Sequence, residues 1–143
     1  EVHRFEGTIN QFLGDGFMAS FGAPLATGED CRNALAASRE LLRRMETLSA
    51  SGRIPPTRIG IGLHAGEAVS GNVGSALRKQ YSITGNVVVL ASRIEQLNKN
   101  HGTQILVSAE VLAAGGSEAR DAVSLGPVQL KGRNEPIEIF RLA

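Results

Sequence analysis

The sequence predicts one α+β domain, an α/β sandwich in which helices pack on one side of a single mixed sheet. Short runs of β-branched and aliphatic residues, typical of strands, alternate along the chain with stretches of helical periodicity. The length of 143 residues suits one domain. We therefore expect residues 1–143 to fold around one core.

The composition narrows the class of protein. Hydrophobic residues make up 42% of the chain and aromatic residues only 4%, which predicts a soluble domain with an aliphatic core. A net charge of +1 gives no electrostatic reason to expect nucleic acid or a membrane surface as partner. The single cysteine, Cys31, excludes an internal disulfide and fits a reducing, cytoplasmic compartment.

Two further features concern the chain as a whole. No apolar run approaches the length of a membrane span. The numbering opens at Glu1 without an initiator methionine, so we expect a domain taken from a longer protein that can carry sensor or membrane segments.

The first elements surround a turn that carries one acidic residue. Residues 1–6 predict the end of a helix, closed by Gly7. Apolar runs at 8–13 and 17–21 flank a Gly-Asp-Gly turn centred on Asp15, which predicts a β-hairpin. A carboxylate on a rigid turn suits a hard cation, although Asp-Gly is also a common turn former with no other role.

A helix and three strands should follow. Residues 30–49 carry one apolar face at helical spacing, with Cys31 in that face. Residues 58–64 alternate isoleucine and leucine with glycine, so one face of this strand is bare and lets another backbone or a ligand approach. His64 lies on that face, either as a base or as a packed histidine. Shorter strands are expected at 66–74 and 78–84.

A second helix is predicted at 86–98. Its buried face is expected to consist of Val87, Leu90, Ala91, Ile94 and Leu97. Val89 and Arg93, four residues apart, share a second face with Asn86.

The C-terminal part predicts three strands and a short helix. A strand at 104–107 leads into a helix at 108–113, with Ser108 as its N-cap. Two strands at 122–130 and 136–142 are expected to pair.

Five blocks of this sequence, in this order and spacing, resemble the catalytic domain of bacterial class III adenylate and guanylate cyclases. The blocks are FLGDGFMA at 12–19, RIGIGLHAGE at 58–67, GNVG at 71–74, YSITG with ASRIE within 81–95, and LKG at 130–132. The resemblance implies a ferredoxin-like βαββαβ core and a head-to-tail homodimer with shared active sites. It also implies conversion of ATP to cyclic AMP and pyrophosphate with two divalent metal ions, Mg²⁺ or Mn²⁺.

The resemblance also implies roles for individual residues. Asp15 matches one of two metal-binding aspartates, and the second, in an upstream Phe-x-Asp segment, has no counterpart here. The domain is therefore expected to lack its N-terminal strand and first metal-binding segment. Arg93 matches the arginine that stabilises the transition state at the α-phosphate, and Lys131 matches the lysine that contacts the terminal phosphates.

Three positions depart from the family pattern. Gln11 and Ser82 stand at the base-reading positions, and the amide of Gln11 can face adenine or guanine, so ATP is favoured and a guanylate cyclase is an alternative. Val89 replaces an asparagine that orients the ribose, and Asn86 is placed to substitute for it in part. These departures support a second hypothesis, a pseudo-cyclase that binds nucleotide or only dimerises and regulates a fused partner.

Overall fold

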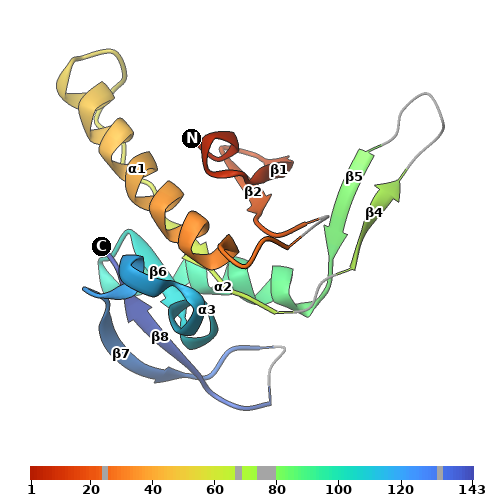
Figure 1. Cartoon of the computed structure of the whole chain (residues 1–143). Coiled ribbons are helices and arrows are strands. Elements are labelled where there is room, and N and C mark those ends of the chain that lie inside the picture. Colours follow the sequence, from red (N-terminus) through yellow and green to blue (C-terminus); the bar gives the residue numbers. More distant parts are fainter. Residues whose placement is uncertain (24–25, 67–68, 74–79, 132–133) are drawn as a thin grey trace.

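The computed structural model describes residues 1–23, 26–66, 69–73, 80–131 and 134–143 (Figure 1). In chain order the elements are η1 (His3–Phe5), β1 (Thr8–Leu13), β2 (Gly16–Ser20), α1 (Asp30–Ala50), β3 (Ile61–Leu63), β4 (Val69–Val73), β5 (Gln80–Thr84), α2 (Asn86–His101), β6 (Ile105–Ser108), α3 (Ala109–Ala114), η2 (Gly116–Ala119), β7 (Val123–Val128) and β8 (Ile137–Arg141).

A four-stranded mixed sheet forms the centre of the domain, in the order β3-β6-β8-β7. β3 is parallel to β6, and the other neighbours are antiparallel. The hairpins β1–β2 and β4–β5 each form a two-stranded sheet of their own, and β4–β5 projects to the right of the body in Figure 1. The α+β class is confirmed, with the hairpins set apart from the main sheet.

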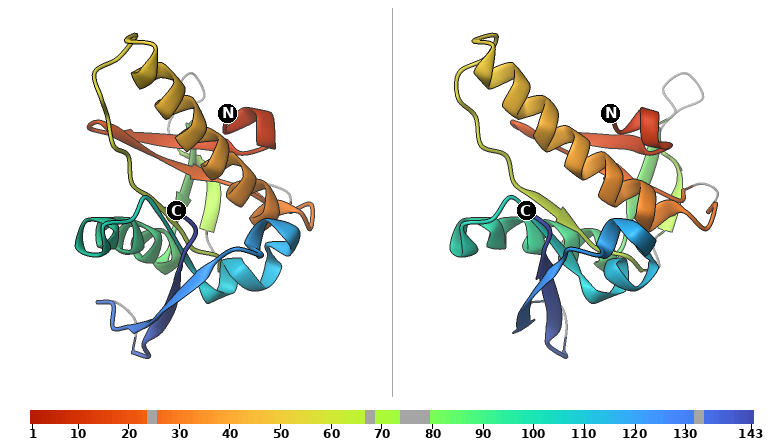
Figure 2. Two further views of the ribbon diagram at one scale, coloured as in Figure 1. Left: turned by 90° about the vertical axis from the view of Figure 1, so that its left-hand side faces the viewer. Right: turned by 60° about the vertical axis from the view of Figure 1, so that its left-hand side comes forward.

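Helices cover both faces of the main sheet (Figure 2). On one face, Leu90 and Ile94 of α2 pack against Leu106 and its neighbours on β8. On the other face, α1 and α3 pack against Ile105 and Val107. The expectation that helices lie on one side only is therefore wrong. All four residues of β6 are fully buried, so both faces of this strand are covered.

The bare face of β3 receives the backbone of α2. A Cβ atom added to Gly62 would lie 2.3 Å from the backbone nitrogen of Glu95 and 2.7 Å from the carbonyl oxygen of Ala91. Only glycine permits this approach, because any side chain would push the helix away from the strand. The close neighbour expected from the sequence is therefore a second segment of the same chain.

Several predicted elements are confirmed with shifted ends. The first helix ends at Ala50, one residue later than predicted, and α2 continues to His101, almost a turn beyond 98. The strand expected at 58–64 is shorter, since regular pairing covers only Ile61–Leu63. The expected N-terminal helix end is the 3-10 turn η1, closed by Glu6 with a φ of 66°. The predicted pairing of the last two strands is confirmed by β7 and β8.

Cys31 lies at the edge of the core rather than inside it. Its side chain is half-buried against the cluster that contains Leu35 and Val107. Burial raises the pKa of the thiol above its ordinary value, and the nearby Asp30 carboxylate adds to this effect. The thiol is thus kept in its neutral, weakly nucleophilic form.

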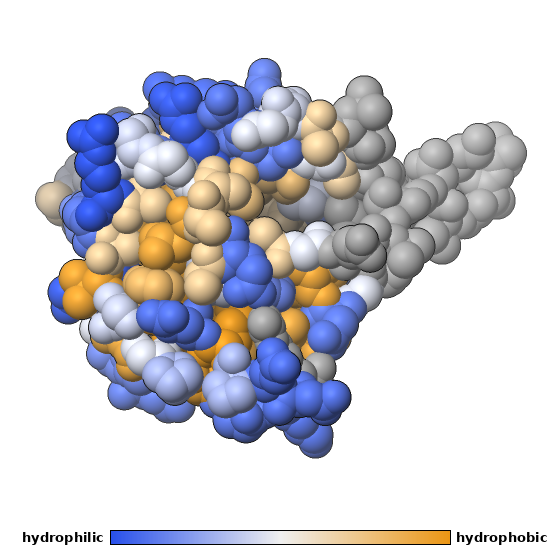
Figure 3. Space-filling view, turned by 60° about the horizontal axis from the view of Figure 1, so that its bottom comes forward, coloured by the Kyte–Doolittle hydropathy of each residue, from blue (hydrophilic) through white to orange (hydrophobic). Residues whose placement is uncertain are grey.

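Apolar atoms also reach the surface of the domain. Figure 3 shows the face that lies at the bottom of Figure 1, where apolar side chains lie between hydrophilic ones along the upper and lower edges. Such exposure is ordinary for a small domain. Among the described residues, no helix is long and apolar enough to cross a membrane.

Candidate active site

The side of α2 that faces away from the sheet presents the residues predicted for phosphate and ribose contact. Leu90 and Ile94 are buried against the sheet, and this fixes the rotation of the helix. Asn86 and Val89 are therefore exposed, Val89 to 42%, and Arg93 is half-buried one turn further on. The second helical face inferred from spacing is confirmed.

Arg93 and Lys131 lie together. The guanidinium Nη1 of Arg93 donates a hydrogen bond to the backbone carbonyl of Lys131, which comes directly after the buried Leu130. This bond joins α2 to the loop after β7 and leaves further N–H donors of the guanidinium for an anion. The Lys131 side chain is exposed at the same place. The two residues predicted to bind phosphate are thus joined through the Lys131 backbone, although 38 residues separate them in the chain.

The β1–β2 hairpin carries Asp15 at its tip and Gln11 on its first strand, and both are exposed. Gly14 in the turn has a φ of 59°, a left-handed conformation that favours glycine. Next to the turn, the rings of Phe12 and Phe17 form an edge-to-face pair with centroids 6.3 Å apart.

A β-bulge distorts the first strand of this hairpin. Ile9 pairs with Ala19 and Gln11 pairs with Met18, so Asn10 is an extra residue in the ladder. Asn10 is 9% exposed, and its side-chain amide has no hydrogen-bond partner among the described residues. A buried amide without a partner is costly, and sequence spacing alone gave no sign of it.

The second base-reading residue, Ser82, lies on β5. Its backbone pairs with Gly71 of β4, and the strand ends two residues later, just before α2. The side chain of Ser82 lies outside the described part of the structure. At the level of the backbone, β5 contacts both β1 and the start of α2.

Asp15 fits a divalent cation as one ligand of a larger set. Carboxylate oxygens are the ligands that Mg²⁺ prefers in proteins, and the exposed turn leaves this carboxylate accessible. The described residues contain no group of three or more His, Cys, Asp or Glu placed to hold a metal ion. A bound ion would therefore need ligands beyond those that the described part of one chain brings together.

His64 is a packed residue. Its side chain is 5% exposed, and Nδ1 lies 2.8 Å from the hydroxyl of Ser108. Ser108 occupies the N-cap position of α3, but its side chain makes no capping hydrogen bond. The prediction of Ser108 as the N-cap residue is therefore confirmed, although its hydroxyl makes no capping bond, and the packed interpretation of His64 is confirmed.

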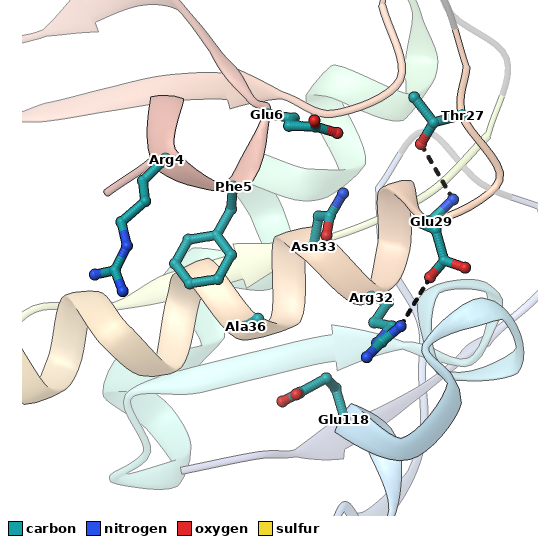
Figure 4. A pocket seen from close by; sticks show the side chains of 9 residues that line it. All are labelled: Arg4, Phe5, Glu6, Thr27, Glu29, Arg32, Asn33, Ala36 and Glu118. Atoms are coloured by element: carbon teal, nitrogen blue, oxygen red, sulfur yellow. Dashed lines mark hydrogen bonds and ion pairs between the residues drawn. The ribbon is translucent and has the colours of Figure 1, made fainter.

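A cavity of about 480 Å³ lies elsewhere, between η1 and the start of α1 (Figure 4). Its lining mixes both charge signs around the ring of Phe5, and Arg32 is already paired with Glu29 across 3.2 Å. None of the predicted site residues lines it. Of those residues, Gln11, Asp15, Asn86 and Lys131 are exposed, on the hairpin, on α2 and in the loop after β7.

Asn98 is a positioning residue that the sequence analysis missed. It is buried on α2, and its Nδ2 donates to the carbonyl oxygens of Ile61 (3.1 Å) and Glu95 (2.9 Å). Its Oδ1 accepts a hydrogen bond from the hydroxyl of Thr103 at 2.9 Å. These bonds tie α2 to β3. The signal in the sequence was a polar residue four positions after Ile94, in line with the buried face.

Comparison with known proteins gives a consistent result. The family described as "Adenylate and Guanylate cyclase catalytic domain" matches residues 8–143. Adenylate cyclase 1 of Rhizobium meliloti (strain 1021) is 35% identical over 147 residues, covering 99% of this chain and 22% of that protein. An uncharacterized protein of Mycobacterium tuberculosis (strain CDC 1551 / Oshkosh) is 37% identical over 140 residues, covering 97% of this chain and 24% of that protein. The chain thus spans about a quarter of the length of these curated relatives.

Solved structures agree with the sequence comparisons. The guanylyl cyclase Cya2 superposes with a TM-score of 0.75 at 32% identity, over 98% of this chain and 71% of that chain. The adenylyl cyclase CyaB from P. aeruginosa gives a TM-score of 0.74 at 28% identity, over 98% of this chain and 73% of that one. The core has the ferredoxin-like arrangement of these domains.

Proposed function

Since the chain belongs to the adenylate and guanylate cyclase catalytic domain family, we propose that it is an adenylate cyclase, which converts ATP to 3′,5′-cyclic AMP and pyrophosphate in signalling. The observation that carries this proposal is the contact between Arg93 and Lys131. It holds the guanidinium of Arg93 against the loop that carries the exposed Lys131, and a triphosphate site needs such cationic residues within reach of one another.

Arg93 is the residue that we assign to the α-phosphate. Its guanidinium is held at one end by the Lys131 carbonyl, so the remaining donors point in a restricted set of directions. A permanently charged, pre-oriented fork stabilises the negative charge that develops when the ribose 3′-hydroxyl attacks phosphorus. The exposed Lys131 ammonium binds the terminal phosphates and so neutralises the leaving pyrophosphate.

Asp15 is the residue that would hold divalent metal ions, Mg²⁺ or Mn²⁺, together with at least one further carboxylate. Such ions, when bound, lower the barrier by activating the 3′-hydroxyl and neutralising phosphate charge.

The site is completed by a second copy of the chain. Among the described site residues, Gln11, Asp15, Asn86 and Lys131 are exposed, which suits a site formed between two protomers. In this homodimer, Asp15 of one protomer serves the site that contains Gln11, Ser82, Arg93 and Lys131 of its partner, and Asn86 lies near the ribose. The same contact occurs twice because the dimer is two-fold symmetric.

ATP is the proposed substrate because the exposed amide of Gln11 can donate to N1 of adenine and Ser82 can accept from the adenine amino group. The 35% identity to a bacterial adenylate cyclase supports this preference. GTP is the alternative, since an amide can rotate to face guanine and a guanylyl cyclase is among the similar structures.

Formation of cyclic nucleotide, measured with Mn²⁺ and either ATP or GTP, tests the proposal. We expect cyclic AMP from the wild-type protein, tested as this chain and as any longer natural form. Asp15→Asn should abolish the product. Glu46→Gln, the control, removes an exposed carboxylate from α1 and should leave the product unchanged. Product from GTP alone would contradict the ATP assignment.

A pseudo-cyclase remains the second candidate because of one observation, the exposed Val89 at the ribose position. This interpretation predicts no product with either nucleotide from a folded, dimeric protein. Activity gained in Val89→Asn would then identify the lost ribose contact as the cause.

Mixing two inactive variants tests the shared site. Asp15→Ala and Arg93→Ala should each be inactive alone. Mixed heterodimers should regain activity, because one of their two sites then has both residues intact. Absence of recovery from a mixture that forms heterodimers would contradict the shared site.

A further inference from the structure

Large apolar side chains are exposed at a few places in the described part of the chain: Phe12 (75%), Phe17 (43%), Val89 (42%) and Val123 (46%). A single exposed apolar residue is ordinary. Phe12 and Phe17 are different, since their rings pack edge to face and form one apolar surface beside a turn. An aromatic pair held this way is typical of an interface anchor.

The tip of the β1–β2 hairpin combines this apolar surface with a negative charge. Asp15 lies in the turn between the two strands that carry Phe12 and Phe17. All three side chains are exposed. The tip, residues 12–17, is therefore aromatic and acidic, and it contains no positive charge.

The outer face of α2 has the complementary pattern. Val89 is apolar and exposed, Arg93 lies one turn further along the helix, and Lys131 is joined to Arg93 through its carbonyl. The first turn of α2 contains no acidic residue, so its N-terminal end stays electropositive. This surface, formed by Val89, Arg93 and Lys131, is therefore apolar and basic.

We propose that Val89 is a dimer contact, on which the Phe12–Phe17 ring pair of a second copy of the chain packs. The proposal rests on the shared-site dimer proposed above, because that dimer brings the hairpin tip of one protomer to α2 of the other. Apolar surface then meets apolar surface while Asp15 faces Arg93, and the two-fold axis repeats the contact. Because one chain carries both the hairpin tip and the complementary surface on α2, the partner that fits both is a second copy of the same chain.

This contact gives the valine a role of its own. An asparagine at position 89 would bring a polar amide against two aromatic rings, and burial of that amide without a partner is unfavourable. Valine instead excludes water from the edge of the site. Water exclusion strengthens the interaction of Asp15 and Arg93 with charges that develop nearby. On this view, position 89 exchanges a ribose contact for a stronger interface.

The dissociation constant of the dimer, measured by sedimentation equilibrium at several protein concentrations, tests this inference. We expect Phe12→Ala and Val89→Asn each to raise it about tenfold, as loss of a central apolar anchor does. The double variant should raise it about twentyfold rather than a hundredfold, because two residues in contact share one interaction. Val89→Ile, which keeps the apolar surface, should leave the constant within about twofold of the wild type.

Val123→Asn is the matched control, since this valine is equally exposed but lies on β7. It should leave the dissociation constant unchanged, and circular dichroism should show that every variant is folded. Independent effects of Phe12→Ala and Val89→Asn, multiplying to about a hundredfold, would overturn the contact. An unchanged dimer in Val89→Asn together with a gain in activity would also overturn it.

These outcomes separate the inference from the proposed function. If the wild-type chain and any longer form stay monomeric at all concentrations, the shared-site dimer fails, and this inference fails with it. If the dimer forms and mixed variants recover activity while Val89→Asn has no effect on dissociation, only the contact at Val89 fails.

Discussion

The two faces of α2 obey different constraints. The inner face is fixed by packing: Leu90, Ile94 and Asn98 are buried, and the helix backbone lies against Gly62 of β3. The outer face carries Asn86, Val89 and Arg93, which have room to change. The inner face therefore determines where the helix lies, and the outer face determines what it can bind. Substitutions on the two faces should be separable by measuring stability and activity on the same variants.

The largest expected effect belongs to the outer face. Arg93→Ala should lower cyclase activity about a thousandfold, roughly 4 kcal/mol of transition-state stabilisation, with little change in melting temperature. Arg93→Lys should remain impaired, because an ammonium lacks the planar fork. Lys99→Ala, which removes an exposed cation from the last turn of the same helix, should keep full activity. A large loss of stability in Arg93→Ala would break the separation of the two faces.

Gly62→Ala probes the inner face directly. A methyl group there would lie 2.3 Å from the Glu95 nitrogen, so strand and helix must separate. We expect a loss of about 3 kcal/mol in the free energy of unfolding, measured by urea denaturation. At Gly66 the nearest atom to an added Cβ is 3.5 Å away, an ordinary contact. Gly66→Ala should therefore cost much less, and equal losses would contradict the steric argument.

Asn98→Ala should cost about 2 kcal/mol of stability, because it leaves the Thr103 hydroxyl and the Ile61 carbonyl without their partner. Thr103→Val removes only one of these bonds and should cost about 1 kcal/mol. Thermal melts of both single variants and the double variant check this. Strictly additive losses would show that the two residues do not act as one unit.

The smallest effect should come from Val89→Asn on the stability of the monomer. The residue is exposed and the two side chains have similar helix propensities, so the change should stay within about 0.5 kcal/mol. Urea unfolding at concentrations below the dissociation constant of the dimer gives this value. A larger loss in the free energy of unfolding would show that Val89 contributes to packing, as the residues of the inner face do.

Sequence periodicity predicted α1 and α2 closely, because the buried residues of each helix recur at helical spacing. The spacing also separated the two faces of α2 and placed Val89 and Arg93 together on the outer one. The contact between Arg93 and Lys131 could be expected only through the family resemblance. No local pattern relates a helix to a loop that follows it 38 residues later.

The remaining differences come from contacts that the sequence does not state. Helices cover both faces of the sheet because β6 is apolar at each of its first three positions, and a short apolar run fits either one covered face or two. Ser108 occupies the N-cap position of α3 without a capping bond, because its hydroxyl is bound to His64, the residue after β3. The bulge at Asn10 was not predicted, because a bulge changes the pairing of a strand without a reliable pattern in its residues.

The bulge at Asn10 also determines which side chains of β1 lie on the same side of the hairpin. Strict alternation would place Phe12 on the side of Thr8 and Gln11 on the side of Ile9. With Asn10 inserted, Gln11 follows Thr8 on the side of Met18 and Ser20, and Phe12 follows Ile9 on the side of Phe17. The residue proposed to read the base and the residue proposed to hold the partner have thus exchanged sides. Deletion of Asn10 would turn the side chains of Gln11 and Phe12 to the opposite sides of the hairpin. Both the base contact and the partner contact proposed above would then be lost.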